Sequence, residues 1–303
     1  MRLLGVDVGG TKVAVAALED GRLGESASTP TPTGDTDALL DDLEARIREA
    51  GSAEAVGVAV PSVIDFATGT ARFSVNIPLA GVPLREVLRE RLGVPVFVDN
   101  DGACAALAEA LGEEADPSTD DLVMVTVGTG LGGGVVIDGR VYRGATGAAA
   151  EVGHMIVAAD VTAGAPARAT PPHPDSWEAW SSGGALGRLA AERGLPDGRA
   201  AVAAARRGEA GGLEAVRILG ERLGVGVANL VNLLDPAVVA IGGGVSAAGD
   251  VLLEPVREVA ERLMLPGVGT RTEIRLARRG GEAGVLGAAL LAGQEREREE
   301  TAA

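Results

Sequence analysis

Cysteine, lysine and histidine are almost absent from this chain of 303 residues, and each scarcity limits what the protein can be. The single cysteine, Cys104, cannot form a disulfide within the chain or supply a multi-cysteine metal site. The single lysine is Lys12, and the only histidines are His154 and His173. Residue types this rare are informative where they occur, and their surroundings decide whether they are functional.

Long apolar runs and excess basic charge are also missing. No run is long enough to cross a bilayer, and the apolar stretch in MRLLGVDVGG is too short for a signal peptide, so we expect a cytoplasmic protein with no membrane partner. The net charge of −16 would repel a phosphate backbone, which disfavours nucleic acid as a partner. A composition of 46% hydrophobic residues indicates a folded globular protein.

Strand-like and helix-like segments alternate along the chain, which indicates an α/β protein. Buried strands are predicted over 2–8, 13–18, 55–61, 94–99, 237–244 and 273–277, with three more within 122–144. Helices are predicted over 37–51, 84–93, 102–112, about 210–234 and about 281–296, with one more between the strands at 237–244 and 273–277. Residues 159–175 have a loop-like composition, and the charged tail EREREETAA is expected to be frayed.

One strand–turn–strand pattern occurs twice. LLGVDVGGTKVAVAAL near the N-terminus is similar to the unit that begins LVMVTVGTGLGGGVV at residue 122. The first copy predicts a hairpin with its turn at Gly9 and Gly10. The two copies together indicate a duplicated fold.

The first turn has the chemistry of a phosphate loop. Gly9 and Gly10 let backbone N–H groups approach a phosphate, and Thr11 can donate its hydroxyl. Lys12 adds a positive charge, and Asp7 can hold Mg²⁺ directly or through water. An ordinary hairpin with an exposed lysine accounts for the same residues, but the placement of the chain's single lysine here favours a phosphate loop.

Three other motifs are less specific when taken singly. VGTGLGGG over 127–134 has Thr129 in place of the acid and the lysine, and IGGGVS over 241–246 suits an adenosine lying close to the backbone. VDND over 98–101 ends a strand and opens a helix, so Asp101 can be a general base and Asn100 a substrate ligand. Helix capping is the simpler interpretation of that motif alone.

In combination, these segments resemble the ROK family of sugar kinases, transcriptional repressors and uncharacterised members. The resemblance covers nearly the whole chain, through LLGVDVGGTK, VGVAVPSVID, NIP, VFVDND, VTVGTGLGGGVV, GATGAAAEVGH, WEAWSSGGAL, NLLDPAVVAIGGGVS and EAGVLGAALLA. It implies the actin-like ATPase (ribonuclease H-like) fold, with two duplicated α/β domains and a cleft between them. We expect one domain over 1–112, joined by a C-terminal helix at about 285–303, and the other over 113–284.

The resemblance also implies a role for individual residues. Asp101 matches the catalytic base that accepts the proton of the attacking sugar hydroxyl. The sugar-binding positions are matched by Asn76, Asn100, Asp101, Glu151, His154 and Glu178. The positions that bind ATP and its Mg²⁺ are matched by Asp7, Gly9, Gly10, Thr11, Lys12, Gly128, Thr129, Gly130, Gly132, Gly242, Gly243 and Gly244, with Asp7 as the metal residue.

The family's zinc site is the largest departure from the pattern. Family kinases bind zinc with the histidine of EVGH and three cysteines, but the aligned cysteine positions here hold Ala169, Pro171 and Ser176. His154 and His173 are too few to close a structural site, so we expect no zinc.

Three smaller departures leave the sugar open. Ser62 and Ala150 stand where glycine is usual, and both add bulk near the expected sugar. Ala103 replaces an asparagine. These positions can alter or abolish glucose binding without touching the phosphate loops.

The sequence therefore predicts an ATP-dependent hexose kinase, with glucose as the default acceptor. Kinases of N-acetylmannosamine, fructose, allose or mannose remain alternatives, as does inorganic polyphosphate as the donor. A non-catalytic sugar-sensing ROK protein is the alternative from another class. Asp7, Lys12 and Asp101 speak against it, and DVGGTK begins at residue 7, which leaves no winged helix before it. The family resemblance further implies a homo-oligomer, either a dimer or a tetramer.

Overall fold

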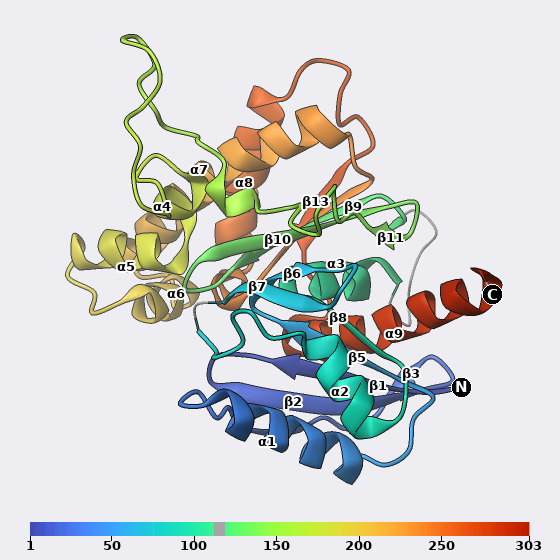
Figure 1. The fold of residues 1–303 in the computed structure, drawn as a ribbon. Coiled ribbons are helices and arrows are strands. Elements are labelled where there is room, and N and C mark those ends of the chain that lie inside the picture. The colour runs from blue at the N-terminus through green and yellow to red at the C-terminus, as the bar shows by residue number, and fades with distance from the viewer. Residues whose placement is uncertain (75, 112–118, 303) are drawn as a thin grey trace. The chain divides into compact units, whose positions relative to one another are not determined.

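The computed structural model describes residues 1–74, 76–111 and 119–302, and these form two compact units (Figure 1). Unit 1 is made of residues 1–120, 134–150 and 281–303. Unit 2 is made of residues 121–133 and 151–280. The domain boundary predicted at residues 112 and 113 lies outside the described residues.

Unit 1 is built on a sheet with the strand order β3-β2-β1-β5-β8, and β4 also pairs with β2. Strand β1 is antiparallel to β2 and parallel to β5, which is parallel to β8. The Gly9 N–H donates to the Lys12 carbonyl at 2.8 Å, which confirms the predicted hairpin. The strands are β1 (Arg2–Val8), β2 (Lys12–Glu19), β3 (Arg22–Leu23), β4 (Ala27–Pro30), β5 (Ala55–Val60) and β8 (Val96–Asn100).

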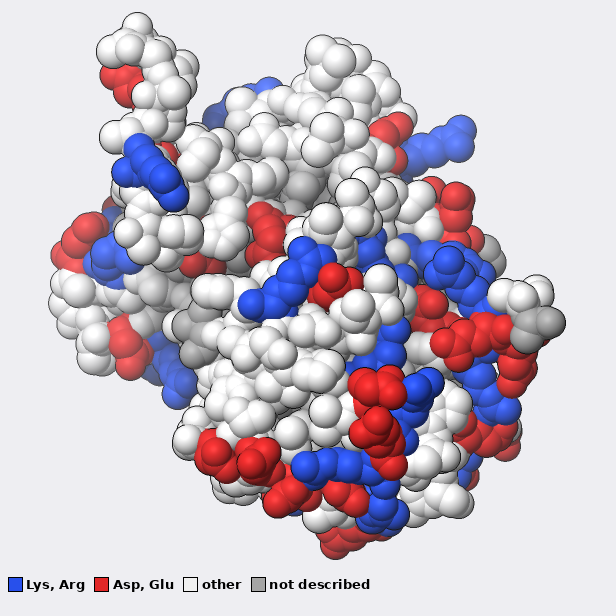
Figure 2. Space-filling model, viewed as in Figure 1, with Lys and Arg blue, Asp and Glu red and all other residues white. Residues whose placement is uncertain are grey.

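The helices of unit 1 are α1 (Thr36–Glu49), α2 (Leu84–Leu92), α3 (Asp101–Leu111) and α9 (Ala283–Ala302). Leu39, Leu43 and Ile47 of α1 are buried in the core, as their spacing predicts. The polar faces of α1 and α2 carry ion pairs such as Arg91 to Asp41, at 2.7 Å. Figure 2 shows basic and acidic side chains intermixed over this part of unit 1. A short hairpin of β6 (Ser62–Asp65) and β7 (Thr70–Ser74) completes the unit, and the sequence did not predict it.

Helix α9 packs closely against the sheet and α3 because glycines remove the side chains in between. A Cβ at Gly57 of β5 would lie 1.7 Å from the Ala288 carbonyl oxygen. A Cβ at Gly287 would lie 1.7 Å from the Cys104 carbonyl oxygen. The prediction of a frayed tail is wrong, because α9 continues to Ala302. Its charges pair along the helix and with the body of unit 1, as Arg296 does with Glu300 at 2.9 Å and with Glu54.

The sheet of unit 2 repeats the strand order of unit 1. Its order is β11-β10-β9-β12-β13, and β12 is parallel to both β9 and β13. This matches β3-β2-β1-β5-β8 strand for strand, which confirms the duplication predicted from the glycine turns. The strands are β9 (Leu122–Val127), β10 (Leu131–Ile137), β11 (Arg140–Val141), β12 (Val238–Gly242) and β13 (Glu273–Leu276), and β10 continues into unit 1 with β11.

Helices α7 (Ala210–Leu234) and α8 (Asp250–Leu263) of unit 2 were predicted, and α7 has the predicted bounds. Three shorter helices were not predicted: α4 (Trp177–Ser181), α5 (Gly183–Ala191) and α6 (Gly198–Arg206). The 3₁₀ segments are η2 (Val152–His154), η3 (Gly244–Ala248) and η4 (Gly280–Glu282). Residues 159–175 form no helix or strand, as predicted. No described helix is long and apolar enough to cross a membrane.

Candidate active site

The carboxylates of unit 1 gather at one edge of its sheet. Strands β1, β5 and β8 are parallel, so their carboxyl ends meet at the same edge. Asp7 lies near the end of β1, and Asp101 begins α3 directly after β8. Burial raises the pKa of the Cys104 thiol of α3 well above its usual value, and the negative charges of Asp99, Asp7 and Asp101 raise it further.

Asp7 is partly buried against the start of α9. A Cβ at Gly284 would lie 2.4 Å from the Asp7 Oδ2 atom, so the glycine leaves the room that this carboxylate occupies. Burial raises the pKa of Asp7, and the positive charge of Lys12 opposes that rise. A desolvated carboxylate beside a glycine turn and a lysine suits a bound cation, because a cation would restore the charge balance.

The NIP segment packs against the first glycine turn. A Cβ at Gly10 would lie 3.2 Å from the Cβ of Asn76, so the predicted sugar residue and the predicted phosphate loop are neighbours in unit 1. Asn76, Thr11 and Lys12 are all exposed. Their side chains are therefore accessible to a ligand.

The two polar residues that open α3 have different roles. Asn100 Oδ1 accepts hydrogen bonds from the backbone N–H groups of Gly102 and Ala103, at 2.8 and 3.3 Å, and its Nδ2 donates to the Ser62 carbonyl at 3.3 Å. Asn100 is thus the helix cap. Asp101 is exposed, and its Oδ1 also accepts from the Gly102 N–H at 2.9 Å. Capping of α3 therefore does not depend on Asp101.

Asp99, in the same motif, is a structural residue that the sequence did not single out. Its side chain is 2% exposed, and its Oδ2 accepts from Arg143 Nε at 2.8 Å. Burial raises the pKa of Asp99, while Arg143 acts in the opposite direction. Arg143 also pairs with Glu295 of α9 at 3.0 Å. These residues are far apart in the sequence, and no local signal joins them.

In unit 2, Glu178 of α4 is hydrogen-bonded to the VGTGLGGG loop. Its Oε2 accepts from the Leu131 backbone N–H at 2.8 Å. A Cβ at Gly130 would lie 2.5 Å from the same oxygen. Glu178, predicted as a sugar ligand, therefore also fixes the backbone of the VGTGLGGG loop, which includes Gly128, Thr129 and Gly132.

The EVGH segment lies against the end of that loop. A Cβ at Gly153 would lie 2.1 Å from the Leu131 carbonyl oxygen, and the His154 N–H donates to the Glu151 carbonyl at 3.1 Å. Glu151 and His154 are both exposed. Ala150, before them, has a φ of 66°, which is unfavourable for alanine and explains why glycine is the usual residue there. The predicted sugar residues are thus carried by both units: Asn76, Asn100 and Asp101 by unit 1, and Glu151, His154 and Glu178 by unit 2.

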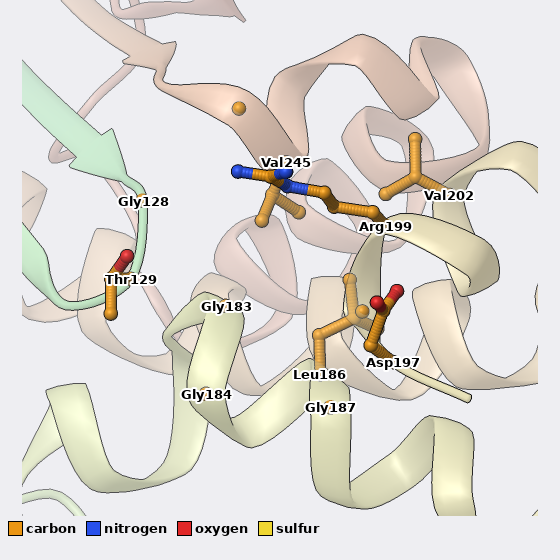
Figure 3. A pocket seen from close by; sticks show the side chains of 12 residues that line it. Gly128, Thr129, Gly183, Gly184, Leu186, Gly187, Asp197, Arg199, Val202 and Val245 are labelled. Atoms are coloured by element: carbon orange, nitrogen blue, oxygen red, sulfur yellow. The ribbon is translucent and has the colours of Figure 1, made fainter. Parts of the chain in front are cut away.

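The VGTGLGGG loop and the IGGGVS turn of residues 241–246 meet at a pocket of about 720 Å³ in unit 2 (Figure 3). Gly128, Thr129 and Gly244 line it together with the start of α5. The Gly183 N–H donates to the Gly128 carbonyl at 2.8 Å, which ties that helix start to the loop. Gly243 has a φ of 85°, and a Cβ there would lie 2.4 Å from the Val127 carbonyl oxygen; Gly242 precedes it in β12. A helix N-terminus beside two glycine turns suits a phosphate-bearing ligand.

Helix α6 adds pocket residues that no sequence motif indicates. Asp197 caps α6 through the Ala200 N–H at 2.8 Å, and both Asp197 and Arg199 line the pocket. Figure 3 shows the Arg199 side chain extending from α6 toward Val245. Among the described residues that line this pocket, Arg199 is the one cation. The letters PDGR contain the cap signal for α6, which would have located the helix but not its place in the pocket.

Hydrogen bonds and packing hold the segment that aligns with the family's zinc loop. Ser176 caps α4 by accepting from the Ala179 N–H at 3.2 Å, and His173 accepts from the Asp175 N–H at 3.1 Å. Trp177 is buried, and its ring packs directly on Gly226. Over the described ranges, no three His, Cys, Asp or Glu side chains are grouped so that they could hold a metal ion.

Comparisons with known proteins agree over almost the full chain. A family model described as "ROK family" matches residues 3–295. A glucokinase of Halalkalibacterium halodurans is 33% identical over 96% of this chain and 95% of its own length. Among solved structures, a ROK family glucokinase from Streptomyces griseus in complex with glucose and AMPPNP is 32% identical, with a TM-score of 0.80 over 97% of this chain and 100% of that chain. A ROK hexokinase from Thermus thermophilus is 34% identical, with a TM-score of 0.79 over 98% and 100%.

Proposed function

This chain belongs to the ROK family, and on that premise we propose that it is a hexose kinase that transfers the γ-phosphate of ATP to a sugar hydroxyl. The predicted α/β fold of the actin-like ATPase class is confirmed by the family match and by the similarity to its structures. The observation that carries the proposal is the carboxyl edge of the parallel strands of unit 1, where Asp7 lies near the end of β1 before the glycine turn and Asp101 follows β8. Glucose is the default acceptor, because similar proteins are named glucokinases.

Asp101 acts as the general base in this proposal. Its carboxylate is exposed at the start of α3, so it can accept the proton of a sugar hydroxyl as that oxygen attacks phosphorus. Asn76, Glu151, His154 and Glu178 offer both hydrogen-bond donors and acceptors, which suits the several hydroxyls of a hexose. N-acetylmannosamine and other hexoses remain alternative acceptors, since Ser62 and Ala150 replace the usual glycines.

The nucleotide occupies the glycine turns in this proposal. The DVGGTK turn and the VGTGLGGG loop hold the phosphates, and the adenosine lies in the pocket lined by Gly244, Arg199 and the start of α5. Asp7 would hold Mg²⁺, which offsets the charge of the phosphates. The remaining catalytic contribution of the chain is to position the two reactants and exclude water.

Lys12→Ala tests the first phosphate contact. The chain has no other lysine, and Lys12 is exposed at the first position of β2. We expect the KM for ATP to rise, or kcat to fall, by about 10-fold, because one charge-assisted hydrogen bond to phosphate is lost. Binding of sugar alone, followed by calorimetry, should be unchanged. Parental ATP kinetics would make Lys12 an ordinary surface residue.

Gly183→Ala tests whether the start of α5 shapes the nucleotide pocket. The new Cβ would lie 2.4 Å from the Gly128 carbonyl oxygen and must displace the glycine loop. Gly211→Ala, in the first turn of α7, is the matched control, since Gly211 does not line this pocket and its Cβ would be 3.5 Å from the nearest side-chain atom. We expect the KM for ATP to rise by about 10-fold in Gly183→Ala and by less than about 2-fold in the control. Equal kinetics in the two variants would contradict this pocket assignment.

We propose that the enzyme needs no zinc. Ala169, Pro171 and Ser176 cannot supply the thiolates that a structural site requires. Protein purified without a histidine tag should contain well below one zinc ion per chain by mass spectrometry of metals. Treatment with a zinc-selective chelator, followed by Mg²⁺, should leave both melting temperature and turnover unchanged. A stoichiometric zinc content would overturn this proposal.

Three further expectations rest on the sequence and on the family resemblance. We propose a cytoplasmic location, a homo-oligomer of two or four chains, and a domain division near residues 112 and 284. Size-exclusion chromatography with light scattering tests the oligomer directly, and a monomer at micromolar concentration would refute it.

A coupled assay of ADP release tests the proposed activity. A panel of glucose, mannose, fructose, allose, N-acetylglucosamine and N-acetylmannosamine is supplied with Mg-ATP, and polyphosphate is tested as a second donor. We expect sugar-dependent ADP release, fastest with glucose. Release that is the same with and without every sugar would refute the hexose kinase assignment, and tight sugar binding without release would instead indicate a sensor.

A further inference from the structure

A second cavity, lined by arginines, lies wholly within unit 1. It has a volume of about 620 Å³, in the range of small-molecule sites. Four arginines line it, together with Asp65, Phe66, Ala67 and the loop of residues 144–147; these arginines are Arg72, Arg85, Arg143 and Arg298. None of the residues assigned to sugar or nucleotide above is among its lining residues. We call it the arginine pocket.

Arg85 is the arginine with the least charge compensation in this pocket. Its guanidinium donates to the backbone carbonyls of Ala67 and Phe66, and over the described ranges no carboxylate lies within ion-pair distance of it. Its Nε is buried and has no hydrogen-bond partner there. Burial lowers the pKa of Arg85, and Glu299 and Glu295 oppose this at longer range. A desolvated cation that lacks a carboxylate partner is suited to bind an anion.

The β6–β7 turn and the Phe66 ring hold the Arg85 side chain in place. A Cβ at Gly69 would lie 2.2 Å from the Arg85 Cβ, so the β6–β7 turn packs directly on this side chain. The Arg85 and Arg143 guanidinium carbons lie 5.0 and 3.5 Å from the centre of the Phe66 ring. Two cations held against one aromatic ring are pre-organised, which lowers the entropy lost when a ligand binds.

The carboxylates near the pocket only partly neutralise it. Arg72 pairs with Asp65 at 3.3 Å, and Arg143 pairs with the buried Asp99 at 2.8 Å. Glu295 is shared by Arg143 at 3.0 Å and Arg298 at 3.6 Å. Three carboxylates thus pair directly with Arg72, Arg143 and Arg298, whereas Glu299 acts on Arg85 only at longer range. Over the described ranges, Arg85 therefore keeps a positive charge with no carboxylate at ion-pair distance, in a chain whose net charge is −16.

From this arrangement we infer that the arginine pocket binds a small phosphate-bearing anion at a site separate from the one proposed for ATP. The fork of a guanidinium matches the oxygens of a phosphate, and the loop of residues 144–147 lies at the same cavity. The volume admits a phosphorylated sugar as well as free phosphate. The pocket also connects to the proposed catalytic edge, because Arg143 holds Asp99, whose Oδ1 accepts from the Asn100 N–H at 2.9 Å.

Calorimetric titration of the full chain at constant ionic strength tests this inference, with inorganic phosphate and glucose 6-phosphate as separate probes. We expect saturable binding with a Kd of about 1 mM or lower. Arg85→Gln should weaken it by at least about 10-fold. Arg89→Gln is the matched control: it lies one turn further along α2, does not line the pocket and pairs with Glu86, so it should leave binding unchanged.

Two more variants keep the result interpretable. Arg298→Gln alters a side chain that is 63% exposed, so it tests the pocket even if Arg85→Gln does not fold. Lys12→Ala separates this pocket from the ATP phosphate loops, and it should leave the Arg85-dependent binding intact. Tighter binding of glucose 6-phosphate than of phosphate would identify an ester as the ligand, and equal binding would identify the free anion. Absence of saturable binding, or binding that depends on Lys12 and not on Arg85 or Arg298, would overturn the inference.

Discussion

Asp101→Asn should lower turnover by at least ~10²-fold and leave the melting temperature close to that of the parent. The amide cannot accept the proton of the attacking hydroxyl, whereas it has nearly the size of the carboxylate. Helix α3 should survive the change, because Asn100 provides the cap through the N–H groups of Gly102 and Ala103. Steady-state kinetics with saturating sugar and Mg-ATP, together with thermal unfolding, measure both quantities.

Asp99→Asn is the control that separates catalysis from structure in the same motif. Asp99 is 2% exposed and, unlike Asp7, is hydrogen-bonded to a largely buried arginine, Arg143. Because the amide leaves that cation without its partner, Asp99→Asn should destabilise the fold by roughly 1–3 kcal/mol, although burial raises the pKa of both carboxyls. Asp101→Asn should therefore lose turnover and keep its stability, whereas Asp99→Asn should lose stability. If Asp101→Asn turns over within a few-fold of the parent, Asp101 is not the base.

Asp7→Asn should also reduce turnover by ~10²-fold or more, and yet it should not reduce the stability of the ligand-free protein. Burial raises the pKa of Asp7 in the folded state, so its ionised form opposes folding at neutral pH. Replacing the carboxylate with an amide removes that unfavourable charge but also the expected Mg²⁺ ligand. Thermal unfolding without Mg²⁺ or nucleotide should give a melting temperature equal to or above that of the parent.

The pH dependence fixes the sign of this effect. Because the pKa of Asp7 is raised in the folded state, the ionised carboxylate lowers the free energy of unfolding at pH 7. This loss of stability disappears as the pH falls through the folded-state pKa toward the unperturbed value of about 3.9. The difference in melting temperature between parent and Asp7→Asn should therefore shrink on acidification. Asp41→Asn, at a side chain that is 72% exposed, should show no such trend. A large loss of stability in Asp7→Asn at pH 7 would mean that Asp7 is structural.

Local patterns predicted the parts of the fold that depend on local chemistry. The β1–β2 hairpin follows from Gly9 and Gly10 between apolar runs, and the bounds of α7 follow from a long periodic segment. The repeated glycine turns predicted a duplication that the strand orders of both sheets confirm. Helices α5 and α6 were missed because they begin at Gly183 and Gly198, and glycine is an unfavourable residue inside a helix.

Long-range contacts account for what the sequence could not predict. The tail is charged along its length, but Glu295 and Arg296 are held by Arg143 and Glu54, from distant parts of the chain, so α9 continues through it. The VDND motif contains two aspartates, and its letters do not say which of them is buried. The structure shows that Asp99 is buried and Asp101 is exposed. Arg85 and Arg143 belong to no recognisable motif, and the fold alone brings them together at Phe66.

Phosphorus NMR of the reaction mixture tests the central claim most directly. The full chain is incubated with glucose and Mg-ATP, and Asp101→Asn is run in parallel. We predict a phosphate monoester signal that grows in step with ADP in the parent and is at least ~10²-fold slower in the variant. ADP accompanied by inorganic phosphate and no phosphate monoester, or glucose binding with no change in ATP, would contradict the assignment of this chain as a hexose kinase.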